Sequence, residues 1–195
     1  AQGTVEFITE SVWQAYYDRI YQEAVAPQRV REAGLRVVYS PLCGAGGEPV
    51  AHMLEKLGAE YHIPQSQKTP SGEFATCPSP NPENDASFAA CYKLADEVKP
   101  DLIMATDPDS DRIAVAIPTA SGYRKFSGNE MGCLLLQYIL RAMKDAGKLP
   151  HDPVAVKSVV STPLADRVAA AYGCKMRTVL TGFKYIGGVI LELEQ

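Results

Sequence analysis

The sequence predicts an α/β protein whose mixed, mainly parallel sheets are flanked by helices. Short β-rich and apolar runs of the kind that form strands recur along the chain, and stretches with helical apolar spacing separate them. Residues 35–40, with the helix that follows them to Leu57, form half of a βαβ unit, and a second unit begins at residues 154–160. A length of 195 residues is sufficient for one large or two modest domains with hydrophobic cores.

The first half of the chain predicts three helices and a long loop. Residues 9–26 carry Val12, Tyr16 and Ile20 at four-residue steps, which predicts an amphipathic helix. Its aromatic stripe is expected to pack in the core or against another domain. The second helix ends at Gly58, and the third spans residues 88–98, after a Pro-rich loop over residues 64–85.

The second half of the chain predicts a hairpin followed by another βαβ unit. Residues 113–117 and 123–126 read as two strands joined by a short turn. Asn129 is expected to cap a helix that stops at Gly147. The remaining elements are predicted as a strand at 154–160, a helix at 163–172 and a strand at 175–179.

Composition excludes several classes of function. The net charge is −4 and there is no basic block, so we expect no nucleic-acid partner. No apolar run approaches the roughly twenty residues of a membrane span, and no membrane association is expected. The five cysteines are widely spaced and form no C-x-x-C pair, which indicates reduced thiols and a cytoplasmic protein rather than a zinc or disulfide framework.

The most informative stretch is the acidic loop T-D-P-D-S-D-R at residues 106–112. It places Asp107, Asp109 and Asp111 between two apolar runs that read as buried strands. Three carboxylates so close together repel one another, and a hard divalent cation relieves this, Mg²⁺ first and Mn²⁺ or Ca²⁺ next. A solvated acidic turn is the alternative. An EF-hand is excluded, since its sixth and twelfth positions would be Arg112 and Pro118 instead of Gly and Glu.

This loop resembles the magnesium loop of the α-D-phosphohexomutases, the phosphoglucomutase and phosphomannomutase family. The resemblance implies that the three aspartates hold Mg²⁺ beside a phosphoserine and that Arg112 faces the same phosphate. A second stretch, T-G-F-K-Y-I-G at residues 181–187, is similar to a loop of the family's third domain. It implies that Thr181, Gly182 and Lys184 contact the sugar phosphate, with Lys184 as a possible proton-transfer group.

The same resemblance implies how the chain is divided. Residues 1–121 correspond to the family's second domain, which carries the metal loop, and residues 122–195 to a truncated beginning of the third, so that one domain type occurs twice. The sequence starts at Ala1 and not at Met, and we expect a parent chain of about 450–600 residues. The missing domains of that parent would be the partners of this fragment.

The activity implied is interconversion of hexose 1-phosphate and hexose 6-phosphate through a phosphoserine and a bisphosphate intermediate, with glucose 1,6-bisphosphate as activator. The nucleophilic serine is absent, because T-A-S at Ser121 is followed by G-Y-R where the family has H-N-P. The isolated chain is therefore expected to be inactive. Glu83 lies in a P-N-P-E segment that resembles a family loop facing the active cleft, without a definite chemical role.

Two other classes of function stay open from the residues alone. A phosphatase of the haloacid-dehalogenase type would use Asp107 as nucleophile and Asp109 as acid/base, although such enzymes have Thr or Val where Asp111 stands. A non-catalytic magnesium-binding module would bind the ion and turn over nothing.

Overall fold

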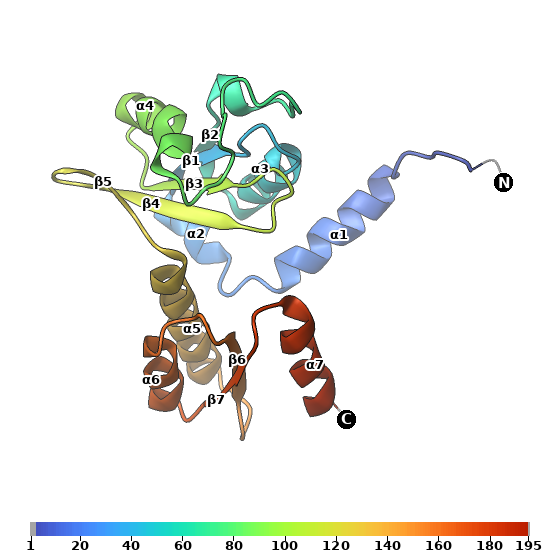
Figure 1. Cartoon of the computed structure of the whole chain (residues 1–195), viewed down its shortest axis with the longest axis vertical. Coiled ribbons are helices and arrows are strands. Elements are labelled where there is room, and N and C mark those ends of the chain that lie inside the picture. The colour runs from blue at the N-terminus through green and yellow to red at the C-terminus, as the bar shows by residue number, and fades with distance from the viewer. Residues whose placement is uncertain (1–2, 195) are drawn as a thin grey trace. The chain divides into compact units, whose positions relative to one another are not determined.

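The computed structural model describes residues 3–194 and divides into two compact units. Unit 1 ends at Lys125 and unit 2 begins at Phe126 (Figure 1). The division falls slightly after the domain boundary predicted at residue 121, because the hairpin strand at 122–125 pairs within unit 1. The boundary between the domains of the parent protein stays a prediction.

Unit 1 is built on one five-stranded sheet with the strand order β2-β1-β3-β4-β5. Strands β2, β1 and β3 run parallel, whereas β4 and β5 form an antiparallel extension. The predicted mixed sheet with flanking helices is confirmed. In chain order the unit contains α1 (Glu10–Gln22), α2 (Gln28–Ala33), β1 (Arg36–Ser40), α3 (Gly47–Leu57), β2 (Glu60–His62), two 3₁₀ turns (Gln65–Gln67 and Asp85–Phe88), α4 (Ala89–Val98), β3 (Leu102–Thr106), β4 (Ile113–Thr119) and β5 (Gly122–Lys125).

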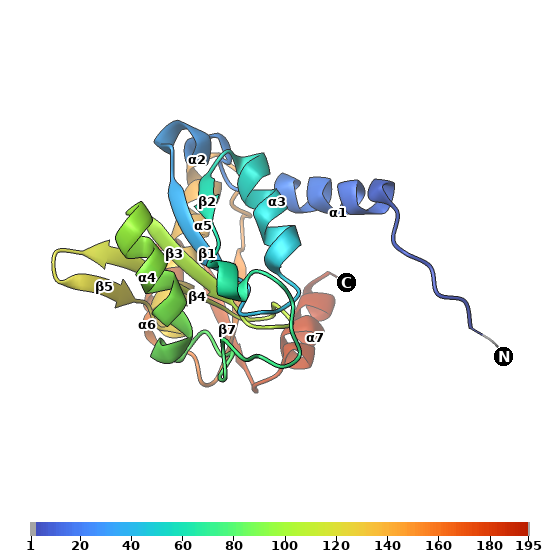
Figure 2. The same ribbon diagram turned by 90° about the horizontal axis from the view of Figure 1, so that it is seen from above.

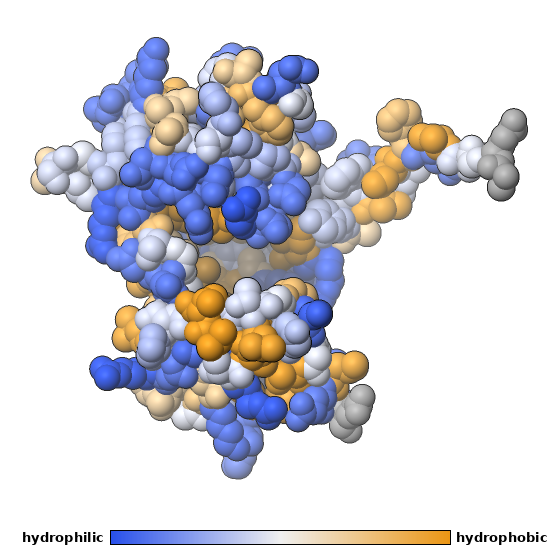
Figure 3. All heavy atoms as spheres, viewed as in Figure 1, coloured by the Kyte–Doolittle hydropathy of each residue, from blue (hydrophilic) through white to orange (hydrophobic). Residues whose placement is uncertain are grey.

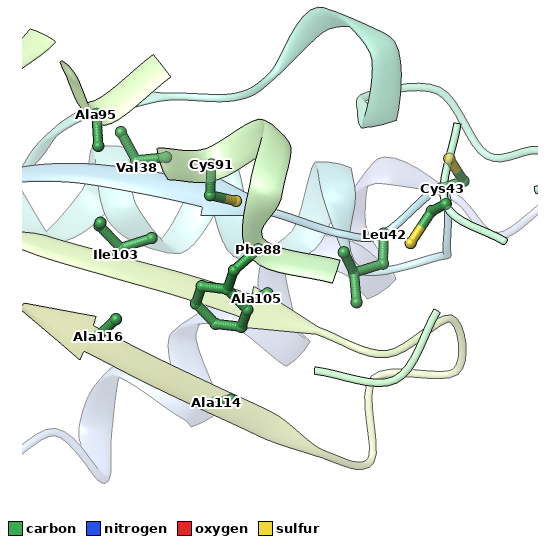
Figure 4. Close-up of a cluster of buried hydrophobic side chains, with 11 residues drawn as sticks. Val38, Leu42, Cys43, Phe88, Cys91, Ala95, Ile103, Ala105, Ala114 and Ala116 are labelled. Atoms are coloured by element: carbon green, nitrogen blue, oxygen red, sulfur yellow. The ribbon is translucent and has the colours of Figure 1, made fainter. Parts of the chain in front are cut away.

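Alternate side chains of β1 and β3 pack against helices on opposite faces of the sheet. Val38 and Ile103 belong to the core cluster under α4, in which Phe88 lies beside Ala105 (Figure 4). The residues of β1 and β3 that alternate with Val38 and Ile103 face the opposite side of the sheet and form a second cluster with α2 and α3. Figure 2 shows strands β1 and β3 between α3 and α4. Burial on both faces explains why these strands read as short continuous apolar runs.

Helix α1 ends earlier than predicted, and its apolar stripe does not enter the core of unit 1. Val12 and Tyr16 are 56% and 52% exposed, while Tyr17 is buried. The ring of Tyr17 stacks on His52 of α3, with 3.9 Å between the ring centroids. Figure 3 shows hydrophobic side chains exposed along this part of the chain. Packing of the stripe against another domain stays a prediction.

In its described residues, 126–194, unit 2 contains a two-stranded parallel sheet and three helices. Its elements are α5 (Gly128–Asp145), β6 (Val154–Ser158), α6 (Leu164–Ala171), β7 (Lys175–Val179) and α7 (Phe183–Leu193). Strands β6 and β7 pair from Val154↔Lys175 to Ser158↔Val179, with α6 as the crossover between them. Leu140, Ala169 and Cys174 form its core. Among the described helices of both units, none is long and apolar enough to cross a membrane.

The cap of α5 differs from the predicted one. Ser127, not Asn129, is the N-cap: its hydroxyl accepts from the Glu130 nitrogen, and the Glu130 carboxylate accepts from the Ser127 nitrogen. This reciprocal arrangement is a capping box. The side chain of Asn129 instead accepts a hydrogen bond from the Thr162 nitrogen at 2.9 Å, which ties α5 to the loop after β6.

Candidate functional site

The acidic loop lies at the carboxyl edge of the parallel part of the sheet. Strands β1 and β3 are parallel neighbours, with Ser40 paired to Ala105. The segments that follow these two strands therefore leave the sheet at the same edge. The loop at 107–112 follows β3 there, and the glycine-rich turn at 41–46 follows β1. Ligands of open α/β sheets bind at this edge. The topology therefore places the predicted metal loop where a ligand can reach it.

The loop brings its three carboxylates together. One oxygen each from Asp107, Asp109 and Asp111 can be chosen so that all three lie within 4.8 Å of one another. Asp107 is 1% exposed, whereas Asp109 and Asp111 are exposed to solvent. The cluster is thus anchored at its buried end and open at the other.

Arg112 closes the loop by binding Asp107 twice. Its main-chain nitrogen donates to Asp107 Oδ1 at 3.0 Å, and its Nε donates to Oδ2 at 2.8 Å. The same Nε lies 3.6 Å from Asp111 Oδ1. Half of the Arg112 side chain remains exposed, so the guanidinium is both a structural partner of the loop and a cationic group at its surface.

The carboxylates of the loop differ in acidity. Burial opposes ionisation of Asp107, but the hydrogen bonds from Arg112 outweigh it and hold the pKa of Asp107 below its usual value. The pKa of Asp111 is raised, first because it shares a hydrogen bond with Asp107 and then because Asp109 is close. Asp107 raises the pKa of Arg112 by accepting its hydrogen bond, and the charge of Glu83 adds to this shift.

These features fit a hard divalent cation. The donors are carboxylate oxygens, which Mg²⁺, Mn²⁺ and Ca²⁺ prefer, with neither a thiolate nor an imidazole in the cluster. The pKa of Asp111 is raised first by its hydrogen bond with Asp107 and then by the charge of Asp109, and a bound divalent ion would relieve this repulsion between the carboxylates. The residues present are therefore suitable ligands for the predicted ion.

The Pro-rich loop at 64–85 contacts Lys125 at the end of β5. The ammonium of Lys125 donates to the Glu83 carbonyl oxygen and lies 2.7 Å from Asp85 Oδ1. Glu83 also acts on the pKa of Arg112, as described above. The structure thus gives Glu83 an electrostatic connection to the acidic loop that the sequence did not suggest.

The second predicted site lies in unit 2 and is described on its own. Gly182 has φ +131° and ψ 132° and immediately precedes α7, a conformation that L side chains rarely adopt. Thr181 and Lys184 are exposed on either side of it. The Lys184 ammonium lies 4.9 Å from the centroid of the Tyr185 ring. The strand-to-helix turn predicted here is present, and its lysine points to solvent.

The sequence analysis did not predict the hydrogen bond that joins β1 to the start of the acidic loop. Tyr39 of β1 and Thr106 of β3 are buried and share a hydrogen bond of 2.8 Å between their hydroxyl oxygens. Their only sequence signal was a polar side chain within each apolar run. The glycines of the turn at 41–46 also contact the acidic loop, and local sequence patterns do not predict these contacts.

Fold and loop together define an α/β protein with an acidic site at the carboxyl edge of its sheet. Family models for the phosphoglucomutase/phosphomannomutase alpha/beta/alpha domains II and III match residues 14–122 and 127–194, respectively. The chain therefore belongs to the phosphoglucomutase/phosphomannomutase family.

Individual relatives show how much of such a protein is present. The chain is 34% identical over 164 residues to a probable phosphoribomutase of Schizosaccharomyces pombe, covering 83% of this chain and 28% of that protein. It is 36% identical over 157 residues to a probable phosphomannomutase of Haemophilus influenzae, covering 80% of this chain and 31% of that protein. It thus spans less than a third of the length of either relative.

A solved structure shows the same fold. The crystal structure of a phosphoglucomutase/phosphomannomutase family protein from Burkholderia thailandensis superimposes with a TM-score of 0.72, covering 93% of this chain and 36% of that chain at 17% sequence identity.

Proposed function

We propose that the chain is the middle portion of a sugar-phosphate mutase that interconverts hexose 1-phosphate and hexose 6-phosphate. In the parent protein a phosphoserine would give its phosphoryl group to the free hydroxyl of the sugar phosphate. The resulting bisphosphate would then turn and return its other phosphoryl group to the serine. The observation that carries the proposal is the cluster of three aspartates with Arg112 at the carboxyl edge of the sheet, in a chain of this family.

Asp107, Asp109 and Asp111 are proposed as the ligands of Mg²⁺. When bound, Mg²⁺ neutralises negative charge on the transferred phosphoryl group, which is where most of the catalytic gain in phosphoryl transfer arises. Asp107 is suited to a fixed ligand, because its carboxylate is buried and held by two donors from Arg112. The exposed pair, Asp109 and Asp111, would complete the site from the solvent side.

Arg112 is proposed to steady the phosphoserine phosphate. Its bonds to Asp107 use the main-chain nitrogen and Nε, and half of the side chain is exposed. A guanidinium fixed at Nε can present its outer face to a phosphate without a further loss of side-chain freedom. This supports a double role for Arg112, in which it holds Asp107 and contacts the phosphate.

Thr181, Gly182 and Lys184 are proposed to bind the sugar phosphate. The backbone at Gly182 needs a residue without a Cβ, which allows a ligand to approach the main chain closely. The Lys184 ammonium is exposed one residue into α7, where it can meet an anionic ligand or transfer a proton.

The remaining partners follow from the same proposal. The hexose phosphate is the substrate, glucose 1,6-bisphosphate the activator, and the domains absent from this chain complete the site. A probable phosphoribomutase and a probable phosphomannomutase both match the chain, which supports assigning to it the phosphoryl transfer common to these mutases. The five free cysteines support a cytoplasmic location.

A dehalogenase-type phosphatase is the less favoured function. Its nucleophile would be Asp107, but that carboxylate is 1% exposed and both of its oxygens accept hydrogen bonds from Arg112. A nucleophile needs an accessible oxygen aimed at the phosphorus. The buried, fully engaged Asp107 suits a ligand and loop anchor better than an attacking group.

Binding of Mn²⁺, followed by electron paramagnetic resonance in the chelator-treated chain, tests the metal site directly. The unsubstituted 195-residue chain is expected to bind Mn²⁺ and to release it when Mg²⁺ is added. Asp109→Asn should abolish binding. Asp145→Asn is the matched control, because Asp145 is also exposed and lies in α5 of unit 2. Equal Mn²⁺ binding by the unsubstituted chain and by Asp109→Asn would contradict the assignment of Asp109 as a metal ligand.

Activity of the isolated chain separates the two enzyme classes. With glucose 1-phosphate, glucose 1,6-bisphosphate and Mg²⁺ we expect no glucose 6-phosphate, because the chain lacks the nucleophilic serine motif. With an aryl phosphate we expect no release of phosphate. Metal-dependent release that is lost in Asp107→Asn would instead identify a phosphatase.

A further inference from the structure

The glycine-rich turn after β1 lies directly against the acidic loop. The Ala45 nitrogen donates to the Pro108 carbonyl oxygen at 2.8 Å. A Cβ built on Gly44 would lie 2.2 Å from Pro108 Cα and 2.5 Å from its carbonyl oxygen. These are backbone atoms, so an added methyl group could be accommodated only by moving one chain away from the other.

A second contact lies two residues further on, at Gly46. A Cβ on Gly46 would lie 2.5 Å from Ser110 Oγ and 2.9 Å from Thr106 Oγ1. The same Cβ would lie 2.7 Å from the Tyr39 hydroxyl, which is hydrogen-bonded to Thr106. Tyr39 is fully buried, and burial raises the pKa of its hydroxyl to about 12.

The turn itself is held in a strained conformation. Leu42 and Cys43 have positive φ values of 48° and 61°, which non-glycine residues adopt at a cost. Hydrogen bonds compensate: the Leu42 nitrogen donates to Ser40 Oγ at 3.0 Å, and the Cys43 nitrogen donates to the Gln67 carbonyl oxygen at 3.2 Å. Such strain persists only where the surroundings impose it, and it concentrates at functional sites.

We propose that Gly44, Gly46 and Tyr39 are positioning residues for the metal site. Pro108 stands between the ligands Asp107 and Asp109, so the surface against which it rests sets the separation of their carboxylates. This inference rests on the proposed function of the loop as a magnesium site. It adds that the turn after β1, which supplies no ligand of its own, determines the geometry of that site.

The chemistry of the ions gives the proposal a specific signature. Mg²⁺ and its substitute Mn²⁺ need near-octahedral ligands at short distances, whereas Ca²⁺ accepts longer and more variable ones. Displacing Pro108 should therefore weaken Mn²⁺ and Mg²⁺ binding more than Ca²⁺ binding. Loss of residues that orient ligands from behind typically costs about 10- to 100-fold in metal affinity.

The test compares Gly44→Ala with Gly72→Ala. Gly72 lies in the loop at 64–85 of the same unit, and a Cβ there would meet nothing within 4 Å. Mn²⁺ and Ca²⁺ dissociation constants are measured by calorimetry on the whole chain, and circular dichroism verifies folding. Gly44→Ala is expected to lose about 10- to 100-fold in Mn²⁺ affinity and less in Ca²⁺ affinity, and Gly72→Ala is expected to match the parent.

Tyr39→Phe provides a second, milder variant if Gly44→Ala does not fold. It removes the hydroxyl that binds Thr106 and is expected to shift Mn²⁺ affinity in the same direction by a smaller factor. A folded Gly44→Ala or Tyr39→Phe with parental Mn²⁺ and Ca²⁺ affinities overturns the proposal. So does an equal loss for the two ions, which would indicate a general loosening of the unit.

A separate measurement distinguishes this inference from the proposed function. If the unsubstituted 195-residue chain binds no divalent ion, the proposed magnesium site is wrong. The coupling of the turn to the loop is then judged without metal, from the amide NMR signals of residues 109–112. Large shifts of those signals in Gly44→Ala, with none in Gly72→Ala, would show that the turn fixes the conformation of the loop, and unchanged signals would overturn that coupling as well.

Discussion

Asp107 differs from its two neighbours in what holds it. Its buried carboxylate accepts two hydrogen bonds from Arg112, whereas Asp109 and Asp111 face solvent. A carboxylate held in this way contributes to folding even without metal. The exposed pair contributes mutual repulsion instead, since the pKa of Asp111 is raised by its hydrogen bond with Asp107 and by Asp109.

Substitution of single aspartates should therefore have opposite effects on the metal-free protein. In chelator at neutral pH, Asp107→Asn is expected to lower the melting temperature by several degrees, because the Arg112 donors lose their charged acceptor. Asp109→Asn and Asp111→Asn are expected to leave it unchanged or raise it slightly, because a repulsive charge is removed. Thermal melting followed by circular dichroism measures this. A strong decrease for all three would show that every carboxylate has structural partners.

The pH dependence follows from the directions of the two pKa shifts. Asp107 has a lowered pKa, so its stabilisation is present above the ordinary value of 3.8 and is lost as pH falls through the lower folded value. Asp111 has a raised pKa, so ionising it removes stability as pH rises from 3.8 through the higher folded value. The benefit of Asp111→Asn should accordingly appear above this window and disappear below it.

At the scale of elements, the capping box of α5 is the clearest local determinant of unit 2. Ser127→Ala removes the side-chain acceptor of the Glu130 nitrogen and is expected to cost about 1 kcal/mol of stability. Urea unfolding of unit 2, followed by an NMR signal from α5, measures the loss. Ser121→Ala, in the hairpin of unit 1, is the control and should leave that transition unchanged. An unaffected α5 in Ser127→Ala would mean that tertiary contacts alone fix the start of the helix.

Elements with a strong periodic signal were predicted from the sequence, and those that depend on tertiary contacts were not. Strands β1, β3, β6 and β7 were expected at nearly their observed positions, because their β-rich and apolar runs leave little choice. Strand β2 was missed, since Glu60–His62 is short and polar and pairs only because β1 lies beside it. Choosing Asn129 over Ser127 as the cap illustrates the same limit, because both residue types favour that position.

The acidic loop was recognised from its spacing, but its support was not. Three aspartates at alternate positions carry a chemical meaning that survives without structure. The contact between Gly44 and Pro108 joins residues far apart in the chain and exists only because β1 and β3 are adjacent. Sequence patterns report local spacing. Contacts between the loops that follow two neighbouring strands can be predicted only when the fold is known.

At the scale of the whole molecule, each unit exposes apolar side chains that a complete protein would be expected to cover. In unit 2, Val160 and Leu191 are 70% and 59% exposed, and Phe183 precedes Lys184 with its ring largely in solvent. In unit 1, Phe7 is exposed before α1, and Val12 is exposed within α1. Exposed patches of this kind favour association with further chain segments or with other copies.

Limited proteolysis tests whether the two units are independent in solution. Chymotrypsin is expected to cut first near Phe7, before α1, and then near Phe126, where unit 1 ends and unit 2 begins, since cleavage follows local opening. The acidic loop should survive inside the larger product, because β3 and β4 flank it as central strands of the sheet. Mass spectrometry of the products identifies the sites. A single resistant species that spans both Asp107 and Lys184, monomeric at high concentration, would show that the chain unfolds as one cooperative body and that the exposed apolar residues are covered within it.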